Sequence, residues 1–327
     1  MSPSLLLHPP GQLSPAAAYY ISRQAPAVLQ GSPSTVSSSP LSALFSEKES
    51  PELWLKYENM LLSCLRTEND QAAHLFLERL VTRFGDDNER IMAFKGLLKE
   101  AVARQNGDQV RILNEYDQIL SENDTNIPIT KRRISLLRSM GRVSDAASSL
   151  VQLLEFSPTD AEAWSELSDI YLSQGLYAQA IYAVEEVLVL APNAWNIHAR
   201  LGEMQYMAAN ATGASSGSYQ KYMAEALKRF ARSIELCDDY LRGYYGLKLV
   251  TNKLLQDSNK SNKQVDDDEF ALPDVGTIER LNELSTAKLS EIVRHSTAQD
   301  RGWRGYDPVE VAAARELLSS DAAAIER

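Results

Sequence analysis

The sequence has 327 residues, 44% of them hydrophobic, and a formal net charge of −11 at pH 7. This hydrophobic content can build a sizeable core, while the acidic balance argues against a general nucleic-acid-binding role. No run of apolar residues approaches the ~18 that a transmembrane helix needs, so we expect no membrane span within the chain.

The first 50 residues form a Ser/Pro-rich segment that holds 12 serines and 7 of the 13 prolines. This composition buries little apolar surface, so residues 1–50 are predicted to be mostly disordered. A short helix is expected at residues 14–30, where Ser14 can cap the helix and Pro15 occupies its first position. The early stretch "LLL" is too short for a signal-peptide core, which predicts a cytosolic or nuclear chain.

The central part of the chain carries an internal repeat. Gly107, Gly141 and Gly175 are spaced by 34 residues, and Ala146 and Ala180 repeat at the same interval. This period is the signature of tetratricopeptide repeats, which are stacked helical hairpins. We therefore predict an all-α fold, a tetratricopeptide-repeat superhelical solenoid whose open end is covered by C-terminal capping helices.

The clearest repeat unit is the stretch "AEAWSELSDIYLSQGLYAQAIYAVEEVLVLAPN". Apolar residues recur at helical spacing on both sides of a break, where Gly175 can adopt the left-handed conformation that ends a helix. Thr159 followed by Glu162 indicates a capping box at the start of the first helix. Trp164 and Ala180 are expected to pack between the two helices of this hairpin.

About five such hairpins fit residues 51–256, and the fourth is split by an insertion near residues 209–219. Repeats tolerate such insertions, because the added residues emerge on one face of the array. Residues 257–273 are rich in polar and acidic side chains and are predicted to be a disordered acidic loop. The amphipathic pattern that follows predicts C-terminal helices over residues 274–327.

No recognisable reactive constellation occurs in the sequence. The four histidines are isolated, and the usual nucleotide-binding, hydrolase and metalloprotease motifs are missing. We therefore predict no catalytic residue, no metal site and no cofactor. Cys64 and Cys237 are expected to be buried core thiols of a reducing compartment, and the run "KRR" at 131–133 a solvated helix face. The glycosylation sequons at Asn123 and Asn210 are expected to stay unmodified in a chain without a signal sequence.

The architecture itself predicts a function, which is to bind partner segments in a concave groove lined by the first helix of each repeat. Helical phase makes this face basic in one repeat and acidic in the next two. The candidate groove residues are Lys131, Arg138, Glu162, Asp169, Leu172, Glu203 and Tyr206, together with Ser135, Ser165, Asn196 and Ala199. The acidic side chains would repel a peptide carboxylate, which argues against a co-chaperone that clamps one.

The order of segments resembles the family of subunit 2 of the endoplasmic reticulum membrane protein complex. The resemblance covers roughly residues 50–255 and is carried by "YDQILSENDTN", "RRISLLRSMGRVSDAASSL", "DAEAWSELSDIYLSQGLYAQAIYAVEEVLVLAPNAWNIHARLGEMQY", "YMAEALKRFARSIEL" and "LRGYYGLKLV". The upstream "ELWLKYENMLLSCL" resembles the entry helix of that family. The Ser/Pro-rich start and the stretch "DSNKSNKQVDDDE" do not match it strongly and resemble lineage-specific insertions.

This resemblance implies a non-catalytic scaffold, peripheral on the cytosolic face of the endoplasmic reticulum, in a hetero-oligomer with membrane-embedded subunits. Such a subunit would hold their cytosolic tails and domains and support the insertion of tail-anchored and polytopic proteins. Two alternatives stay open. One is a free-standing repeat adaptor that binds peptides in a chaperone or ubiquitin-ligase assembly, and the other is an enzyme whose site carries no known motif. Composition and spacing do not separate the scaffold from the adaptor, and only the resemblance favours the scaffold.

Overall fold

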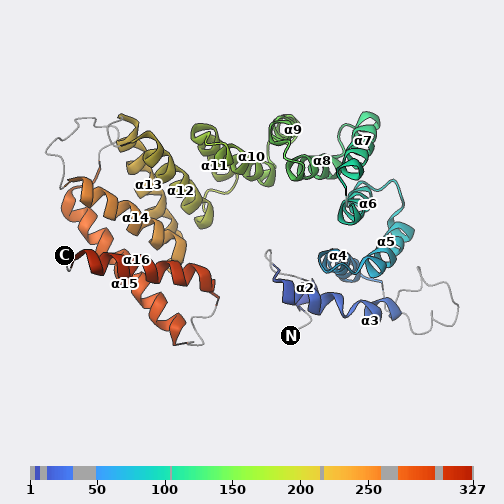
Figure 1. Ribbon diagram of the computed structural model, residues 1–327, viewed down its shortest axis with the longest axis horizontal. Coiled ribbons are helices and arrows are strands. Elements are labelled where there is room, and N and C mark those ends of the chain that lie inside the picture. The colour runs from blue at the N-terminus through green and yellow to red at the C-terminus, as the bar shows by residue number, and fades with distance from the viewer. Residues whose placement is uncertain are drawn as a thin grey trace. The chain divides into compact units, whose positions relative to one another are not determined.

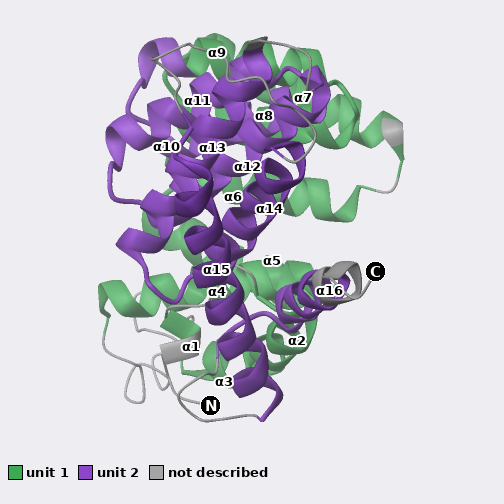
Figure 2. Ribbon diagram, turned by 90° about the vertical axis from the view of Figure 1, so that its left-hand side faces the viewer, with its two compact units in different colours: residues 1–153 green, residues 154–327 purple. Residues whose placement is uncertain are grey.

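The computed structural model describes residues 4–7, 13–31, 49–103, 105–213, 217–258, 272–298 and 305–325. Within these ranges the chain forms α-helices and turns without a β-strand, which confirms the all-α prediction. Two units divide the chain, residues 1–153 and residues 154–327 (Figure 2). Most of the predicted acidic loop at 257–273, part of the insertion near 209–219 and much of the Ser/Pro-rich segment lie outside the described residues.

Helical hairpins form the first unit (Figure 1). Its helices are α1 (Ser4–Leu7), α2 (Pro15–Ser22), α3 (Ala25–Gln30), α4 (Pro51–Arg66), α5 (Asp70–Phe84), α6 (Glu89–Val102), α7 (Asn106–Glu122), α8 (Ile127–Ser139) and α9 (Val143–Phe156), whose last turn crosses into the second unit. Helix α6 packs against both α7 and α8, so one hairpin stacks on the first helix of the next.

The second unit continues the same pattern. Its helices are α10 (Ala161–Ser173), α11 (Tyr177–Leu190), α12 (Trp195–Thr212), α13 (Gly217–Leu236), α14 (Leu241–Ser258), α15 (Val275–Thr297) and α16 (Pro308–Ile325). Helix α12 contacts α11, α13 and α14, and α15 packs between α14 and α16 at the end of the unit. Over the described part of the chain, no helix combines the length and the apolar character that crossing a membrane requires.

Short polar side chains mark the starts of several helices. The Ser14 hydroxyl accepts a hydrogen bond from the backbone N–H of Ala17 at 3.2 Å, and α2 begins at the proline that follows. The predicted capping box at the start of α10 was wrong, because the N-cap is Asp160 rather than Thr159. Asp160 directly precedes the first helical residue, so its carboxylate can accept the hydrogen bond from the N–H of Ala163 at 3.0 Å.

Two of the three periodic glycines close equivalent turns. Gly141 and Gly175 have φ angles of 74° and 72°, the left-handed region that favours glycine, and each lies two residues after the last residue of a repeat's first helix. The backbone hydrogen bonds are equivalent too, because the residues after these glycines donate to Leu137 and Tyr171 at 2.9 Å. Gly107 differs, because α7 has already begun at the preceding residue and the glycine lies in its first turn.

The core of the first unit joins its N-terminal helices to the first repeat hairpin. Tyr57, Phe76 and Leu80 are fully buried where α4 packs on α5. Ile21 and Ala25, from α2 and α3, belong to the same apolar cluster. Burying each large apolar side chain contributes about 1.5–3 kcal/mol, so this cluster anchors the N-terminal helices to the repeats.

The basic run "KRR" is not the solvated face that the sequence predicted. The Arg132 guanidinium donates through Nε to Glu100 at 3.1 Å, and the Tyr116 hydroxyl donates to the same carboxylate at 2.5 Å. Arg133 Nε lies 2.6 Å from an Asp117 carboxylate oxygen. Helix α8 packs against both α6 and α7, so adjacent cations reach carboxylates on two different helices. The run therefore stabilises helix packing.

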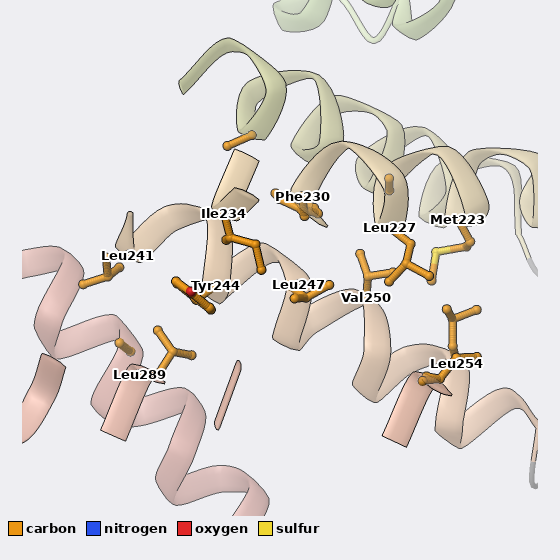
Figure 3. Close-up of a cluster of buried hydrophobic side chains, with 14 of the residues drawn as sticks. Met223, Leu227, Phe230, Ile234, Leu241, Tyr244, Leu247, Val250, Leu254 and Leu289 are labelled. Atoms are coloured by element: carbon orange, nitrogen blue, oxygen red, sulfur yellow. The ribbon is translucent and has the colours of Figure 1, made fainter. Parts of the chain in front are cut away.

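The core of the second unit runs from α12 to the C-terminal helices. Figure 3 shows side chains of α13, among them Phe230 and Ile234, facing Tyr244 and Leu247 of α14, with Leu289 of α15 beside them. Residues of α16 belong to the same cluster. The C-terminal helices therefore cover apolar surface of the last repeats, as the capping prediction requires.

In the hairpin of α10 and α11, the small residue Ala180 is fully buried between the helices, whereas the tryptophan is not. Ala180 is fully buried, and its carbonyl accepts a hydrogen bond from the buried Ser168 hydroxyl at 2.9 Å. Trp164 was predicted to pack between the two helices, and this was wrong, because its side chain is only half-buried. Its Nε1 donates to the Pro158 carbonyl at 2.9 Å, and its ring meets the exposed Tyr182 edge-on. The hydrogen bond holds the indole at the edge of the hairpin.

The two cysteines differ in burial. Cys64 lies in α4 with no exposed surface, as predicted. Cys237 is only half-buried, because it follows the last residue of α13 and its sulfur lies 3.3 Å from an Asp239 carboxylate oxygen. The sequence placed both in the core, and the second is therefore a correction.

Candidate functional site

A hollow of about 410 Å³ opens between helices of the second unit, and we call it the second-unit hollow. Its walls are formed by α12, α13, α14 and α16 and by Tyr240, which precedes α14. The lining residues are Asn196, Ala199, Arg200, Glu203, Tyr206, Phe230, Tyr240, Leu241, Arg242, Tyr245, Gly246, Leu249, Glu310 and Ala313. Four of them, from α12, are among the groove residues that helical phase predicted.

Helical periodicity explains the contribution of α12. Asn196, Ala199, Glu203 and Tyr206 are three or four residues apart, so they lie along one face of that helix. Ala199 is almost fully buried and belongs to the apolar core, while Glu203 reaches solvent. The face therefore changes from an apolar base to a polar rim within a single helix.

Aromatic side chains dominate the apolar surface of the hollow. Tyr206, Tyr240 and Tyr245 are partly buried and pack against the core of the second unit. Phe230 lies beneath them with 4% of its surface exposed. Gly246 also lines the hollow, and a Cβ there would overlap the Phe230 ring. The missing side chain lets α14 approach this ring closely.

The charged groups of the rim are paired with one another. Arg200 donates to Glu203 at 2.7 Å and to Asp169 of α10 at 3.1 Å. Burial disfavours the charged guanidinium, but the hydrogen bonds to Glu203 and Asp169 outweigh it and raise the pKa of Arg200. Two of the three acidic residues that the sequence placed in the groove, Asp169 and Glu203, are thus bridged by one cation, although Asp169 itself does not line the hollow.

A second ion pair joins the repeat array to the last helix. Arg242, near the start of α14, donates to Glu310 of α16, with Nη2 at 2.6 Å from the carboxylate. The hydrogen bond to Glu310 raises the pKa of Arg242. Because Glu310 itself lines the hollow, α16 forms part of its wall.

The remaining predicted groove residues lie elsewhere. Leu172 is half-buried against the cluster of α11 and α12, and Glu162 is exposed in the first turn of α10. Lys131 and Arg138 lie on α8 of the first unit, Lys131 partly and Arg138 largely exposed. Ser135 and Ser165 are partly exposed on α8 and α10. None of these residues lines the second-unit hollow.

Sequence reasoning missed several residues of the hollow. Arg242, Tyr245 and Leu249 recur at helical spacing on α14, and this pattern could have identified them as a face. Arg200 directly follows a predicted groove position. Glu310 carries no such signal, because its partner Arg242 is 68 positions away in the chain.

The chemistry available in this hollow is that of a binding surface. Tyrosines supply large, rigid contact area with a polar end, and they are enriched in protein interfaces together with arginine. Across the residues that the structure describes, no three His, Cys, Asp or Glu side chains form a group that could hold a metal ion. The arrangement therefore suits an apolar or aromatic side chain from a partner, framed by polar contacts at the rim.

Comparisons with known proteins support the repeat assignment. Residues 74–218 match the family model described as the EMC2 TPR-like repeat domain, which confirms the tetratricopeptide-repeat prediction. The TPR repeat protein oca3 of Schizosaccharomyces pombe is 30% identical over 262 residues, which make up 75% of this chain and 88% of that relative.

Other relatives carry the name of a complex subunit. ER membrane protein complex subunit 2-A of Xenopus laevis is 27% identical over 222 residues, covering 68% of this chain and 70% of the relative. ER membrane protein complex subunit 2 of Saccharomyces cerevisiae is 26% identical over 237 residues, covering 71% and 74%. These similarities extend over most of the chain, so they include both described units.

Proposed function

Because the chain belongs to the family of subunit 2 of the ER membrane protein complex, we propose that it is a scaffold subunit of such a complex. In this proposal the protein is non-catalytic and peripheral on the cytosolic face of the endoplasmic reticulum. It holds cytosolic tails and domains of membrane-embedded subunits and thereby supports the insertion of tail-anchored and polytopic proteins.

The second-unit hollow carries this proposal. Its aromatic surface is built on a buried core, and its rim charges are paired, so a partner segment can bury an apolar side chain without leaving a protein charge unpaired. Tyr206 is the predicted groove residue that meets such a side chain, and Asp169 and Glu203 act through Arg200 at the rim. Leu172 and Glu162 extend the proposed surface along α10, and Lys131 and Arg138 are proposed as contacts in the first unit.

The test is affinity purification of the tagged protein from detergent-solubilised membranes, followed by identification of the co-purified chains. The scaffold proposal expects a stable set of membrane-embedded subunits. It also expects Tyr245→Ser, in the hollow, to reduce their recovery, whereas Tyr182→Ser, an exposed tyrosine on α11, leaves recovery unchanged. A partner set made only of soluble proteins would instead support the free-standing adaptor.

A further inference from the structure

A larger hollow lies in the first unit, away from every predicted groove residue, and we call it the first-unit hollow. It has a volume of about 710 Å³ and opens between the start of α4, the end of α5 and the start of α6. Its lining residues are Glu49, Ser50, Pro51, Trp54, Leu55, Glu58, Arg83, Phe84, Asn88, Arg90 and Ile91. The scaffold proposal does not use this site.

Two aromatic rings give this hollow an apolar surface. Trp54 is 7% exposed and meets Phe84 edge-on, with ring centroids 5.4 Å apart. Phe84 is 40% exposed at the end of α5, and the Arg83 guanidinium lies 5.4 Å from its ring centroid. Tryptophan and arginine are the residue types most enriched in binding hot spots, so this surface resembles one.

In the ion pairs around the rings, the arginines are more exposed than their carboxylate partners. In the pair Arg90–Glu58, 64% of the arginine side chain is exposed but only 13% of the glutamate. In the pair Arg83–Glu49 the exposed fractions are 44% and 31%. The cations therefore reach further into solvent than the carboxylates, and an approaching partner meets positive charge first.

The two carboxylates are less accessible than the arginines for different reasons, Glu49 through a second hydrogen bond and Glu58 through burial. The Glu49 oxygen that pairs with Arg83 accepts a second hydrogen bond from Trp54 Nε1 at 3.2 Å. Burial raises the pKa of Glu58, although the nearby Arg90 lowers it in part. The negative groups are therefore less exposed than the arginines that pair with them.

The arginines retain hydrogen-bonding capacity. Arg83 pairs with Glu49 through Nε, and Arg90 pairs with Glu58 through one terminal nitrogen. A guanidinium has five N–H donors, and within the described part of the chain the other donors of these two arginines make no hydrogen bond or ion pair. A carboxylate is the acceptor whose geometry matches such donors.

We propose that the first-unit hollow binds an acidic segment of a partner protein, which places an apolar side chain on Trp54 and Phe84 and carboxylates on Arg83 and Arg90. Exposed cations beside an aromatic surface select a sequence in which acidic residues flank a leucine or an aromatic residue. This inference concerns a different hollow, lined by none of the residues of the scaffold proposal, so either can fail without the other.

The test uses the full chain and a fluorescein-labelled peptide, Gly-Asp-Asp-Leu-Phe-Asp-Asp-Gly, with binding followed by fluorescence anisotropy. We expect binding that weakens when the salt concentration rises. Replacing the aspartates by asparagine, or Leu-Phe by Ser-Ser, should each weaken it by about tenfold. These peptide changes need no protein variant, so they do not depend on how a variant folds. A peptide set with equal affinities would contradict the proposal.

Protein variants locate the site. Arg83→Gln with Arg90→Gln should weaken binding by about tenfold or more, and Phe84→Ser should weaken it with the ion pairs intact. Arg111→Gln is the matched control, because Arg111 is an exposed arginine of α7 outside the hollow, and it should bind like the unchanged protein. Equal losses in the control and the hollow variants would overturn the assignment.

Two other occupants are tested in the same experiment. If the peptide binds only after Leu44 and Phe45 are changed to serine, the chain's own preceding residues fill the hollow, and the proposal fails. If light scattering shows a dimer that Phe84→Ser dissociates, a second copy of the chain is the occupant, and the proposal also fails. A monomer that binds the acidic peptide directly supports it.

Discussion

Gly246 of α14 lies directly against the ring of Phe230 of α13, so close that a Cβ at position 246 would overlap the ring. From the other side, a Cβ at Gly202 of α12 would lie 3.1 Å from the same ring. Three consecutive helices of the second unit thus meet at one phenylalanine, and two glycines make the contact possible. The second-unit hollow is built on this contact, since both Phe230 and Gly246 line it.

We predict that Gly246→Ala lowers the free energy of unfolding by about 1–3 kcal/mol, because the methyl group displaces a buried ring. Chemical denaturation with urea measures this change. Gly107→Ala is the control, since nothing lies within 4 Å of a Cβ there and the residue is helical, so its stability should stay equal or rise. Combining Gly246→Ala with Phe230→Leu should cost less than the sum of the two single changes. Strict additivity would show that the two residues do not press on each other.

The different burial of Ala180 and Trp164 predicts how much stability each contributes to the hairpin of α10 and α11. Ala180→Leu should destabilise by about 1–3 kcal/mol, because the alanine is fully buried and the larger side chain overpacks the core around it. Trp164→Ala should cost less than the roughly 3–5 kcal/mol of a fully buried tryptophan, since the ring is half-exposed. Thermal unfolding of both variants measures the two losses. A loss for Trp164→Ala as large as that of a fully buried tryptophan would contradict the burial that the structure gives.

The cysteines should differ in reactivity. Burial raises the pKa of the Cys64 thiol to about 11, from an ordinary value of 9.0. Burial and the hydrogen bond to Asp239 also raise the pKa of Cys237, but its sulfur is partly accessible. A maleimide added to the native protein should therefore label Cys237 and leave the buried Cys64 unlabelled until the chain unfolds. Mass spectrometry of proteolytic fragments identifies the labelled residue.

The same burial predicts a pH dependence. Because the folded-state pKa of Cys64 lies above its unfolded value, its contribution to stability is complete below pH 9.0 and is lost as the pH rises through about 11. Denaturation midpoints of the unchanged protein should fall over this window more steeply than those of Cys64→Ala. Parallel curves for the two proteins would show that the pKa of the Cys64 thiol is the same in the folded and unfolded states.

The rim of the second-unit hollow should matter for assembly more than for folding. Changing Asp169 and Glu203 to lysine surrounds Arg200 with cations and should reduce recovery of membrane-embedded partners. The melting temperature should change little, since exposed ion pairs contribute about 0–1 kcal/mol. Glu235→Lys is the control, because it breaks an exposed ion pair with Arg232 outside the hollow. Equal recovery from the hollow variant and the control would remove these residues from the site.

Location gives an independent prediction. The side chain of Asn123 lies exposed after α7, accepting hydrogen bonds from Thr125 and donating one to Glu89 at 3.1 Å. An accessible sequon would be glycosylated in the lumen, so a protein on the cytosolic face should carry no glycan at Asn123 or Asn210. A mobility shift on glycosidase treatment would place the chain in the lumen and contradict the proposed location.

Local patterns predicted most of the fold, because repeat helices depend on nearby residues. The period of small residues indicated the turns at Gly141 and Gly175, where the left-handed conformation ends a helix. Gly107 does not form an equivalent turn, because α7 begins one residue earlier, at Asn106. Where a helix starts depends on the competing residues around it. Asp160 replaced Thr159 as a cap for the same reason.

The candidate site was less predictable, because its charges pair across helices. Helical phase grouped residues of α12 such as Glu203 on one face, but it could not show that Arg200 bridges Glu203 to Asp169, 31 positions from that arginine. Nor could it join Glu310 to Arg242 or connect Arg132 with Glu100. Such contacts depend on how distant helices pack, which spacing along one helix does not encode.

The most direct test of the scaffold account is site-specific photocrosslinking in intact membranes, with benzoylphenylalanine placed at Tyr245 in the second-unit hollow or at Tyr182 on the exposed face of α11. The account predicts that the probe at Tyr245 crosslinks to the cytosolic tail or domain of a membrane-embedded subunit, and that the probe at Tyr182 gives no such product. A crosslink to a membrane subunit from Tyr182 alone, or crosslinks from Tyr245 only to soluble proteins, would contradict it.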